Sequence, residues 1–218
     1  MITPFIWGDQ LLAFMKCKIT PLILSIFFAF ANLNAQVKVV GECALQYNIL
    51  EQQGNNWVLI GTKNVLVKGN QCKTTFTTPQ LVQSLIFNTQ SDKAIILKEI
   101  GQNHFMQEIA YPPSNASTML SMKEFTTDTA ARILGYQCKK VQLTWSDETI
   151  YEIQYTNEIM ASVNAFEIAF KDIPGLVLDY TIIPLKGNAI KYQATKIDLS
   201  PISLSQFNIN KELYQIID

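Results

Sequence analysis

The chain is poor in the residues from which most catalytic and metal sites are built. Its 218 residues include a single histidine, His104, and a single arginine, Arg132. One histidine leaves few ways to assemble a Ser-His-Asp triad or a histidine-rich metal site. The charged fraction is 16%, against about 25% in an average globular protein. We therefore expect a protein that is not an enzyme and that needs no cofactor and no metal.

Other absences narrow the class further. The net charge is −1, whereas a nucleic-acid-binding domain carries a basic patch, so no nucleic-acid partner is expected. The four cysteines form no CxxC pair, which argues against a thioredoxin-like redox motif or a zinc site. The hydrophobic fraction of 48% excludes intrinsic disorder. The chain also lacks internal repeats and low-complexity tracts.

Residues 1–35 have the features of a secretory signal peptide. Lys16 and Lys18 form a positive n-region, residues 22–31 (LILSIFFAFA) form the apolar h-region, and Ala35 is the small residue after which we place the cut. The apolar run is shorter than the roughly 20 residues that a membrane-spanning helix needs. The sequence therefore predicts export to the periplasm or secretion.

Translation is expected to start at Met15, because residues 1–14 precede the basic n-region and fit no signal pattern. The alternative is a signal anchor over residues 11–33, which two lysines interrupt. Later in the chain, no segment reaches transmembrane length without a charge, so the mature chain is expected to have no transmembrane segment. Residues 36–218 are expected to form a single β-rich domain.

The mature chain has the period-two alternation of apolar and polar residues that is typical of strands. Residues 39–49 alternate in this way, and residues 141–155 alternate on both sides of a tight turn, which predicts a hairpin. A phase change between Ala194 and Ile197 predicts a bulge. The expected fold is mainly β (α+β), with a curved antiparallel sheet or open half-barrel of about nine to eleven strands joined by short turns.

Two segments depart from the strand pattern. Residues 111–124 contain two prolines and a polar loop, followed by a possible helical turn. In residues 159–171 the apolar positions recur every three or four residues, which predicts one helical stripe that ends at Pro174 and Gly175. We therefore expect one short helix or long loop over the sheet.

Three segments carry a family resemblance: residues 133–141 (ILGYQCKKV), residues 151–156 (YEIQYT) and residues 173–178 (IPGLVL). Their order resembles the GLPGLI-type secreted proteins of Gram-negative cell envelopes, a family of unknown function. Two departures stand out, because the first glycine of the motif is replaced near Asp172 and the closing segment, residues 207–214 (FNINKELY), lacks its proline. The motif residues are Leu134, Gly135, Tyr136, Cys138, Pro174, Gly175 and Leu176.

The resemblance implies an exported protein with a curved antiparallel sheet, similar in appearance to the open half-barrels of lipoprotein carriers (Lol-type), which hold an acyl chain on a concave apolar face. It implies no catalytic residue. We interpret Gly135 and Gly175 as sites of a bend or a positive φ, and Leu176 as a core residue that follows a rigid turn at Pro174. The alternative is that this turn forms the rim of a ligand cleft.

Three cysteines follow the signal segment: Cys43, Cys72 and Cys138. An exported protein permits disulfides, and Cys43 and Cys72 are the candidate pair. The alternative is that Cys138 has a partner elsewhere in the fold, and the odd count leaves one thiol free or in an intermolecular bond.

Three functions remain open on this reasoning. The preferred hypothesis is a non-catalytic binding or carrier protein for a hydrophobic ligand such as a lipid or acyl chain, with no ligand-binding residue named by the sequence. The second is a structural or interaction module of the periplasm or outer membrane, whose partner is another envelope protein. The third, a hydrolase or other enzyme, would need clustered titratable residues in a cleft, which the sequence does not indicate.

Overall fold

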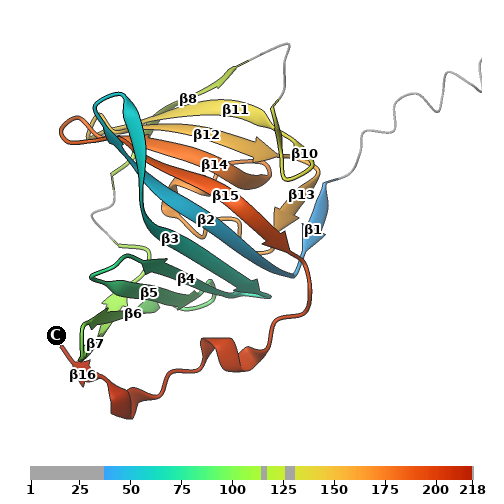
Figure 1. Ribbon diagram of the computed structural model, residues 1–218. Coiled ribbons are helices and arrows are strands. Elements are labelled where there is room, and N and C mark those ends of the chain that lie inside the picture. The colour runs from blue at the N-terminus through green and yellow to red at the C-terminus, as the bar shows by residue number, and fades with distance from the viewer. Residues whose placement is uncertain (1–36, 114–116, 126–130, 218) are drawn as a thin grey trace, which may run out of the picture. The chain divides into compact units, whose positions relative to one another are not determined.

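Most of the described chain belongs to one curved sheet of twelve strands (Figure 1). The computed structural model describes residues 37–113, 117–125 and 131–217, so the predicted signal peptide, residues 1–35, lies outside the described residues. The strands of the sheet are β2 (Glu42–Gln53), β3 (Asn56–Lys68), β4 (Gln71–Thr77), β5 (Val82–Asn88), β6 (Lys93–Ile100), β7 (Asn103–Ala110), β8 (Met119–Phe125), β11 (Lys139–Trp145), β12 (Ile150–Thr156), β14 (Leu176–Ile183), β15 (Ile190–Asp198) and β16 (Gln215–Ile216).

The strand order is β16-β7-β6-β5-β4-β3-β2-β15-β14-β12-β11-β8. All neighbours are antiparallel except β16, which runs parallel to β7. The end strands β8 and β16 do not pair with each other, so the sheet stays open. The predicted curved antiparallel sheet is confirmed, with a slightly higher strand count than expected.

Two small sheets and three short helices complete the described chain. β1 (Lys38–Val40) pairs in parallel with β13 (Ile159–Ala161), and β9 (Arg132–Ile133) pairs with β10 (Tyr136–Gln137). The 3-10 helices are η1 (Ile168–Phe170), η2 (Leu204–Phe207) and η3 (Lys211–Leu213). None of the helices among the described residues is a candidate for a membrane span.

The topology brings the two halves of the chain together at the middle of the sheet. From β2 the chain runs as a meander to β7, and the strands of the second half return until β15 pairs with β2. Both predicted details of the second half are confirmed: β11 and β12 form the hairpin, and the register of β15 shifts between Ala194 and Lys196. The extra residue there explains the phase change in the sequence.

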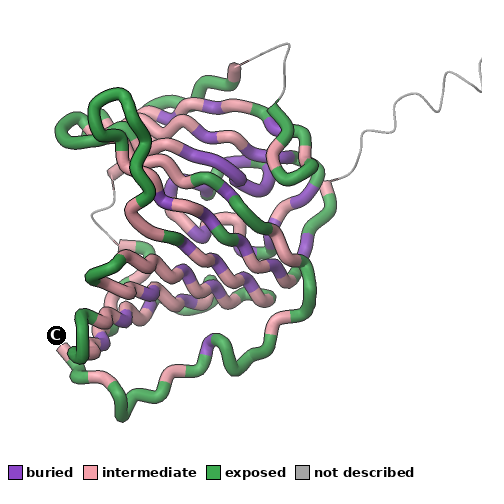
Figure 2. Tube along the Cα trace, in the orientation of Figure 1, coloured by how far each residue is buried: buried purple, intermediate pink, exposed green. Residues whose placement is uncertain are grey.

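One face of the sheet, the inner face, carries the core. Cys43, Leu45, Tyr47 and Ile49 on β2 are buried, as their common phase predicts. The buried positions concentrate on the central strands, whereas the hairpin tips are exposed (Figure 2). Residues 162–175, here called the covering segment, contribute Val163, Phe166, Ala169, Phe170 and Ile173 to the same core cluster.

The expected short helix or loop over the sheet is confirmed, because the covering segment is a loop that contains η1. The two stretches for which the sequence indicates helical turns do not form as such. The end of residues 111–124 belongs to the edge strand β8, in which the apolar side chains are largely exposed. Residues 159–171 form β13, a loop and the single turn η1. Glu167 has an extended backbone (φ −126°, ψ 144°), which interrupts any helix there. The Asn164 side chain instead closes the segment by donating to the carbonyl of Ile173 at 2.7 Å.

Candidate functional site

The inner face carries a lysine that has no contact with solvent. Lys63 lies on β3 in the same phase as Val65 and Val67, and its side chain is 0% exposed. Its cross-strand neighbours are Tyr47 on β2 and Phe76 on β4. A buried ammonium is costly unless a carboxylate and further hydrogen bonds compensate for its lost hydration. The partners of Lys63 therefore define the candidate site.

Lys63 is paired with a carboxylate from the covering segment. Its Nζ donates to Glu167 Oε1 in an ion pair, and it also donates to the hydroxyl of Tyr180 at 2.8 Å. The Tyr180 hydroxyl donates to the same Glu167 Oε1 at 2.5 Å. Burial raises the pKa of Tyr180 well above its ordinary value, so this hydroxyl keeps its proton. Three separate parts of the chain, β3, β14 and the covering segment, thus meet in one hydrogen-bonded cluster.

Aromatic rings surround the Lys63 ammonium, with centroids 5.2–5.7 Å from Nζ. These distances lie within the range of cation–π attraction, about 6 Å. Burial lowers the pKa of Lys63, and the Glu167 carboxylate acts in the opposite direction. The rings belong to Tyr47, Phe76, Phe166, Tyr180 and Tyr192.

A cavity of about 380 Å³ opens beside Glu167, between the covering segment and the inner face. Its volume lies in the range of small-molecule sites, roughly 300–1,000 Å³. A second cavity of about 540 Å³ shares Tyr111, Ser117 and Ile168 with the first. The walls of the first are mostly apolar and aromatic, and they include Phe76, Leu85, Tyr111, Trp145, Tyr151 and Phe166.

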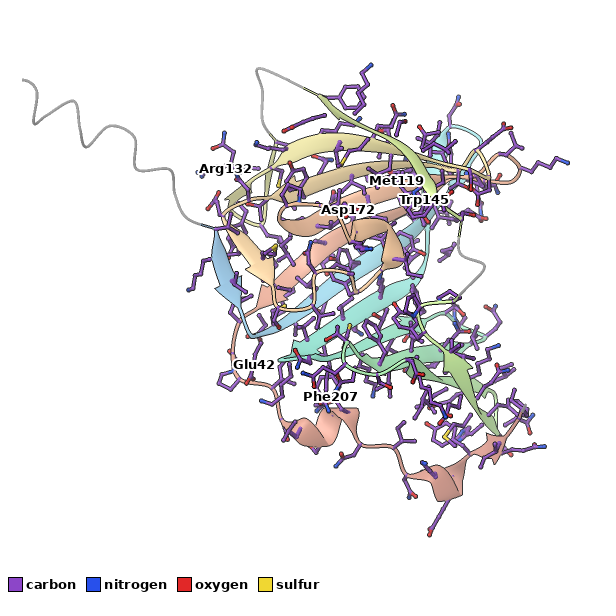
Figure 3. All side chains as sticks on the ribbon, turned by 180° about the vertical axis from the view of Figure 1, so that it is seen from behind. Glu42, Met119, Arg132, Trp145, Asp172 and Phe207 are labelled. Atoms are coloured by element: carbon purple, nitrogen blue, oxygen red, sulfur yellow. The ribbon has the colours of Figure 1, made fainter. Side chains whose placement is uncertain are left out.

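Both charged residues of the first cavity are acidic, and Thr74, Ser117 and Thr149 add hydroxyls to its wall. Glu167 lines it with a side chain that is 20% exposed. Asp147, in the exposed turn after β11, lines it as well and accepts hydrogen bonds from the Ser117 hydroxyl and the Thr149 N–H, each at 3.0 Å. These contacts, the Thr149 N–H first, lower the pKa of Asp147. Figure 3 places Trp145, the last residue of β11, beside its β8 neighbour Met119.

The described residues contain no group of three or more His, Cys, Asp or Glu side chains that could hold a metal ion. The single histidine, His104, lies on β7, where its ring is 5.6 Å from that of Tyr214.

The first of the motif residues form a tight hairpin. Ile133 on β9 pairs with Tyr136 on β10, and Leu134 and Gly135 form the two-residue turn between them. Both turn residues have a positive φ, 51° and 89°, as a type I′ turn requires. The expected positive φ at Gly135 is confirmed. Neither turn residue lines the two large cavities.

The second part of the motif serves packing. Gly175 does not have a positive φ; instead, a Cβ there would lie 2.0 Å from the Thr156 carbonyl oxygen. Only glycine permits β12 and the start of β14 to approach this closely. Leu176 is fully buried, as expected. Pro174 lines a smaller cavity of about 250 Å³, together with Tyr155.

The predicted disulfide between Cys43 and Cys72 is wrong. Both are free thiols, as is Cys138, and all three are buried. Cys43 and Cys72 each pair with Val67 on β3, from opposite sides. They are therefore separated by two strand spacings, about 10 Å, whereas a disulfide requires Cα atoms less than about 7 Å apart. The two strands that carry them are never neighbours in this sheet.

The sequence reasoning missed both charged members of the site. Lys63 shares the phase of two buried valines, and Glu167 interrupts an apolar stretch of residues 165–170. The signal for Lys63 was a charged residue at a position where the alternation of the strand calls for an apolar one. The signal for its partner was Glu167, an acidic residue within an otherwise apolar stretch.

No protein-family model matches this chain, and no curated protein matches it either.

Proposed function

We propose that this chain is an exported cell-envelope protein that binds or carries a hydrophobic ligand, such as a lipid or an acyl chain, without catalysis. The observation that carries the proposal is the cavity of about 380 Å³, whose walls are mostly apolar and aromatic. The second cavity shares part of its wall, which suits an elongated ligand that extends from one into the other. Apolar cavities of this size bind ligands by burying most of their surface.

Export is part of the proposal. The n-region, apolar run and small residue of residues 1–35 support a secretory signal peptide, and with it a periplasmic or secreted location. The resemblance of residues 133–214 to the GLPGLI-type secreted proteins supports the same location. An exported carrier would meet lipids or lipid-modified proteins in the envelope.

The test is to fill the cavity without disturbing the rest of the protein. Leu85 lines the first cavity from β5, and Leu85→Trp adds ring volume to that space. Leu59, which is 58% exposed on β3, provides the matched control, Leu59→Trp. Binding is measured by the fluorescence increase of the lipophilic probe N-phenyl-1-naphthylamine. We expect the wild type and Leu59→Trp to bind the probe, and Leu85→Trp to lose at least tenfold in affinity, about 1.4 kcal/mol.

Two results would contradict the proposal. One is a wild-type protein that binds neither this probe nor added phospholipid. The other is a folded Leu85→Trp variant, as judged by circular dichroism, that binds the probe as tightly as Leu59→Trp does.

One observation favours the second hypothesis, an interaction module. β8 pairs with β11 on one side and is an edge of the sheet on the other, and Leu120 on it is 67% exposed. Exposed edge strands are sites of strand addition by another chain. Under this alternative, Leu120→Lys together with Met122→Lys abolishes association with an envelope partner and leaves probe binding unchanged.

A further inference from the structure

The two oxygens of the Glu167 carboxylate have different surroundings. Oε1 accepts hydrogen bonds from both Lys63 and Tyr180. Among the described residues, Oε2 takes part in no hydrogen bond, although the carboxylate lines the first cavity. A ligand in this cavity would therefore meet a carboxylate oxygen whose capacity to accept a hydrogen bond is unused.

The Lys63 ammonium of the ion pair cannot contact the same ligand. Lys63 is 0% exposed and is not among the residues that line the cavity. Asp147 contributes a second carboxylate to the wall. Lys171 lines the second cavity and not the first. Among the described residues, the wall of the first cavity thus presents two carboxylates and no cationic side chain.

We propose that the first cavity selects amphiphiles whose polar head donates hydrogen bonds, namely amines and hydroxyls, and that it discriminates against carboxylate heads. This inference rests on the proposed function, because it specifies the class of ligand that the cavity holds. The donor head binds at Glu167 Oε2, and the hydrocarbon chain lies against the aromatic wall. A carboxylate head in the same position has no proton to donate to Oε2, so two acceptor oxygens would face each other, and Asp147 adds a negative charge at the wall.

Three ligands with the same C12 chain and different polar heads show how much the head contributes to affinity. The full chain is titrated with dodecylamine, dodecanol and dodecanoate, each below its micelle concentration, and displacement of N-phenyl-1-naphthylamine reports binding. Hydrogen bonds to charged groups are stronger than neutral ones, so we expect dodecylamine to bind roughly tenfold more tightly than dodecanoate. Dodecanol should fall between them, which distinguishes a hydroxyl donor from an ammonium donor.

A charge-neutral variant assigns the selectivity to Glu167. Lys63→Met combined with Glu167→Gln removes both buried charges and keeps an oxygen that can accept the Tyr180 hydroxyl. The ratio of dodecylamine to dodecanoate affinity should fall at least threefold in this variant. Lys93→Met combined with Glu108→Gln removes the same two charges from an exposed pair on β6 and β7 and should leave the ratio unchanged.

The outcomes keep the two proposals apart. If the wild type binds all three ligands equally or prefers dodecanoate, the selectivity is refuted while the hydrophobic site stands. If none of the three binds and the probe does not bind either, the proposed function itself fails. Should the Lys63→Met and Glu167→Gln variant not fold, the wild-type ranking alone decides, because it requires no substitution.

Discussion

Removing the Glu167 carboxylate should destabilise the protein more than a solvent-exposed substitution ordinarily does. Glu167→Ala leaves the Lys63 ammonium without its ion-pair partner in an environment with no solvent exposure. Breaking a buried pair by removing one partner costs about 3–5 kcal/mol, because the remaining charge is uncompensated. At about 2–4 °C per kcal/mol for a domain of this size, the unfolding midpoint should fall by roughly 6–20 °C.

The size of this loss should depend on pH. Burial lowers the pKa of Lys63 below its ordinary value of 10.5, and Glu167 opposes that effect. Without Glu167 the folded-state pKa falls further. Between this lowered pKa and 10.5 the unfolded state binds more protons than the folded state, so the free energy of unfolding rises with pH across that window. Glu167→Ala should therefore regain stability, relative to the wild type, as the pH is raised toward 10.5.

The measurement is urea unfolding, followed by circular dichroism, across a pH series. The double variant Lys63→Met and Glu167→Ala removes both charges and should recover much of the stability that Glu167→Ala loses. The difference in unfolding free energy between the double variant and Glu167→Ala, followed across the pH series, reports the titration of Lys63. Glu108→Ala, which breaks the exposed pair with Lys93, should barely move the midpoint. The reasoning is refuted if Glu167→Ala costs no more than Glu108→Ala, or if its cost does not change with pH.

Two further predictions concern the backbone and the thiols. Gly175→Ala should lower the free energy of unfolding by about 1–3 kcal/mol, because its Cβ would lie 2.0 Å from the Thr156 carbonyl oxygen. Gly41→Ala is the control, because a Cβ there would have nothing within 4 Å. Thermal melts compare the two variants, and equal unfolding midpoints would contradict the prediction. Burial raises the pKa of Cys43 to about 11 and that of Cys72 to about 12, so both should resist iodoacetamide at pH 8 until urea unfolds the protein, as peptide mass mapping can follow. A peptide in which Cys43 is linked to Cys72 would overturn the arrangement of β2, β3 and β4.

The sheet could be predicted from the sequence because alternation is a local property. The phase of residues 43–49 is enough to place one face of β2 in the core, and the phase change near Ala194 marks its bulge. The covering segment could not be predicted in the same way. Its apolar residues recur every three or four positions, and this spacing fits both a helix and an irregular loop that contacts the core at intervals. The choice depends on Glu167, whose partner is 104 residues away.

The failed disulfide shows the same limit from another direction. The sequence favours a bond between Cys43 and Cys72 because both follow the predicted signal segment, but sequence alone does not show which strands are neighbours. The register places β3 between them, with Val67 opposite both. The phase of a strand is set by its own residues, whereas the order of strands in a sheet results from the whole chain. The sequence alone therefore does not predict which cysteines lie on neighbouring strands.

The Lys63 cluster connects stability to the proposed binding site. The covering segment supplies Phe166, Glu167, Ile168 and Ala169 to the wall of the first cavity, so the cavity exists only while that segment stays in place. A neutral apolar contact could hold the segment as firmly, since buried ion pairs are often no more stabilising than well-packed hydrophobic residues. What the ion pair adds is a carboxylate at the cavity wall, because Lys63 compensates Glu167 from behind. Glu167 can therefore face an apolar cavity without the full desolvation cost of its own burial. The cluster in this way places a polar group where a ligand would contact it.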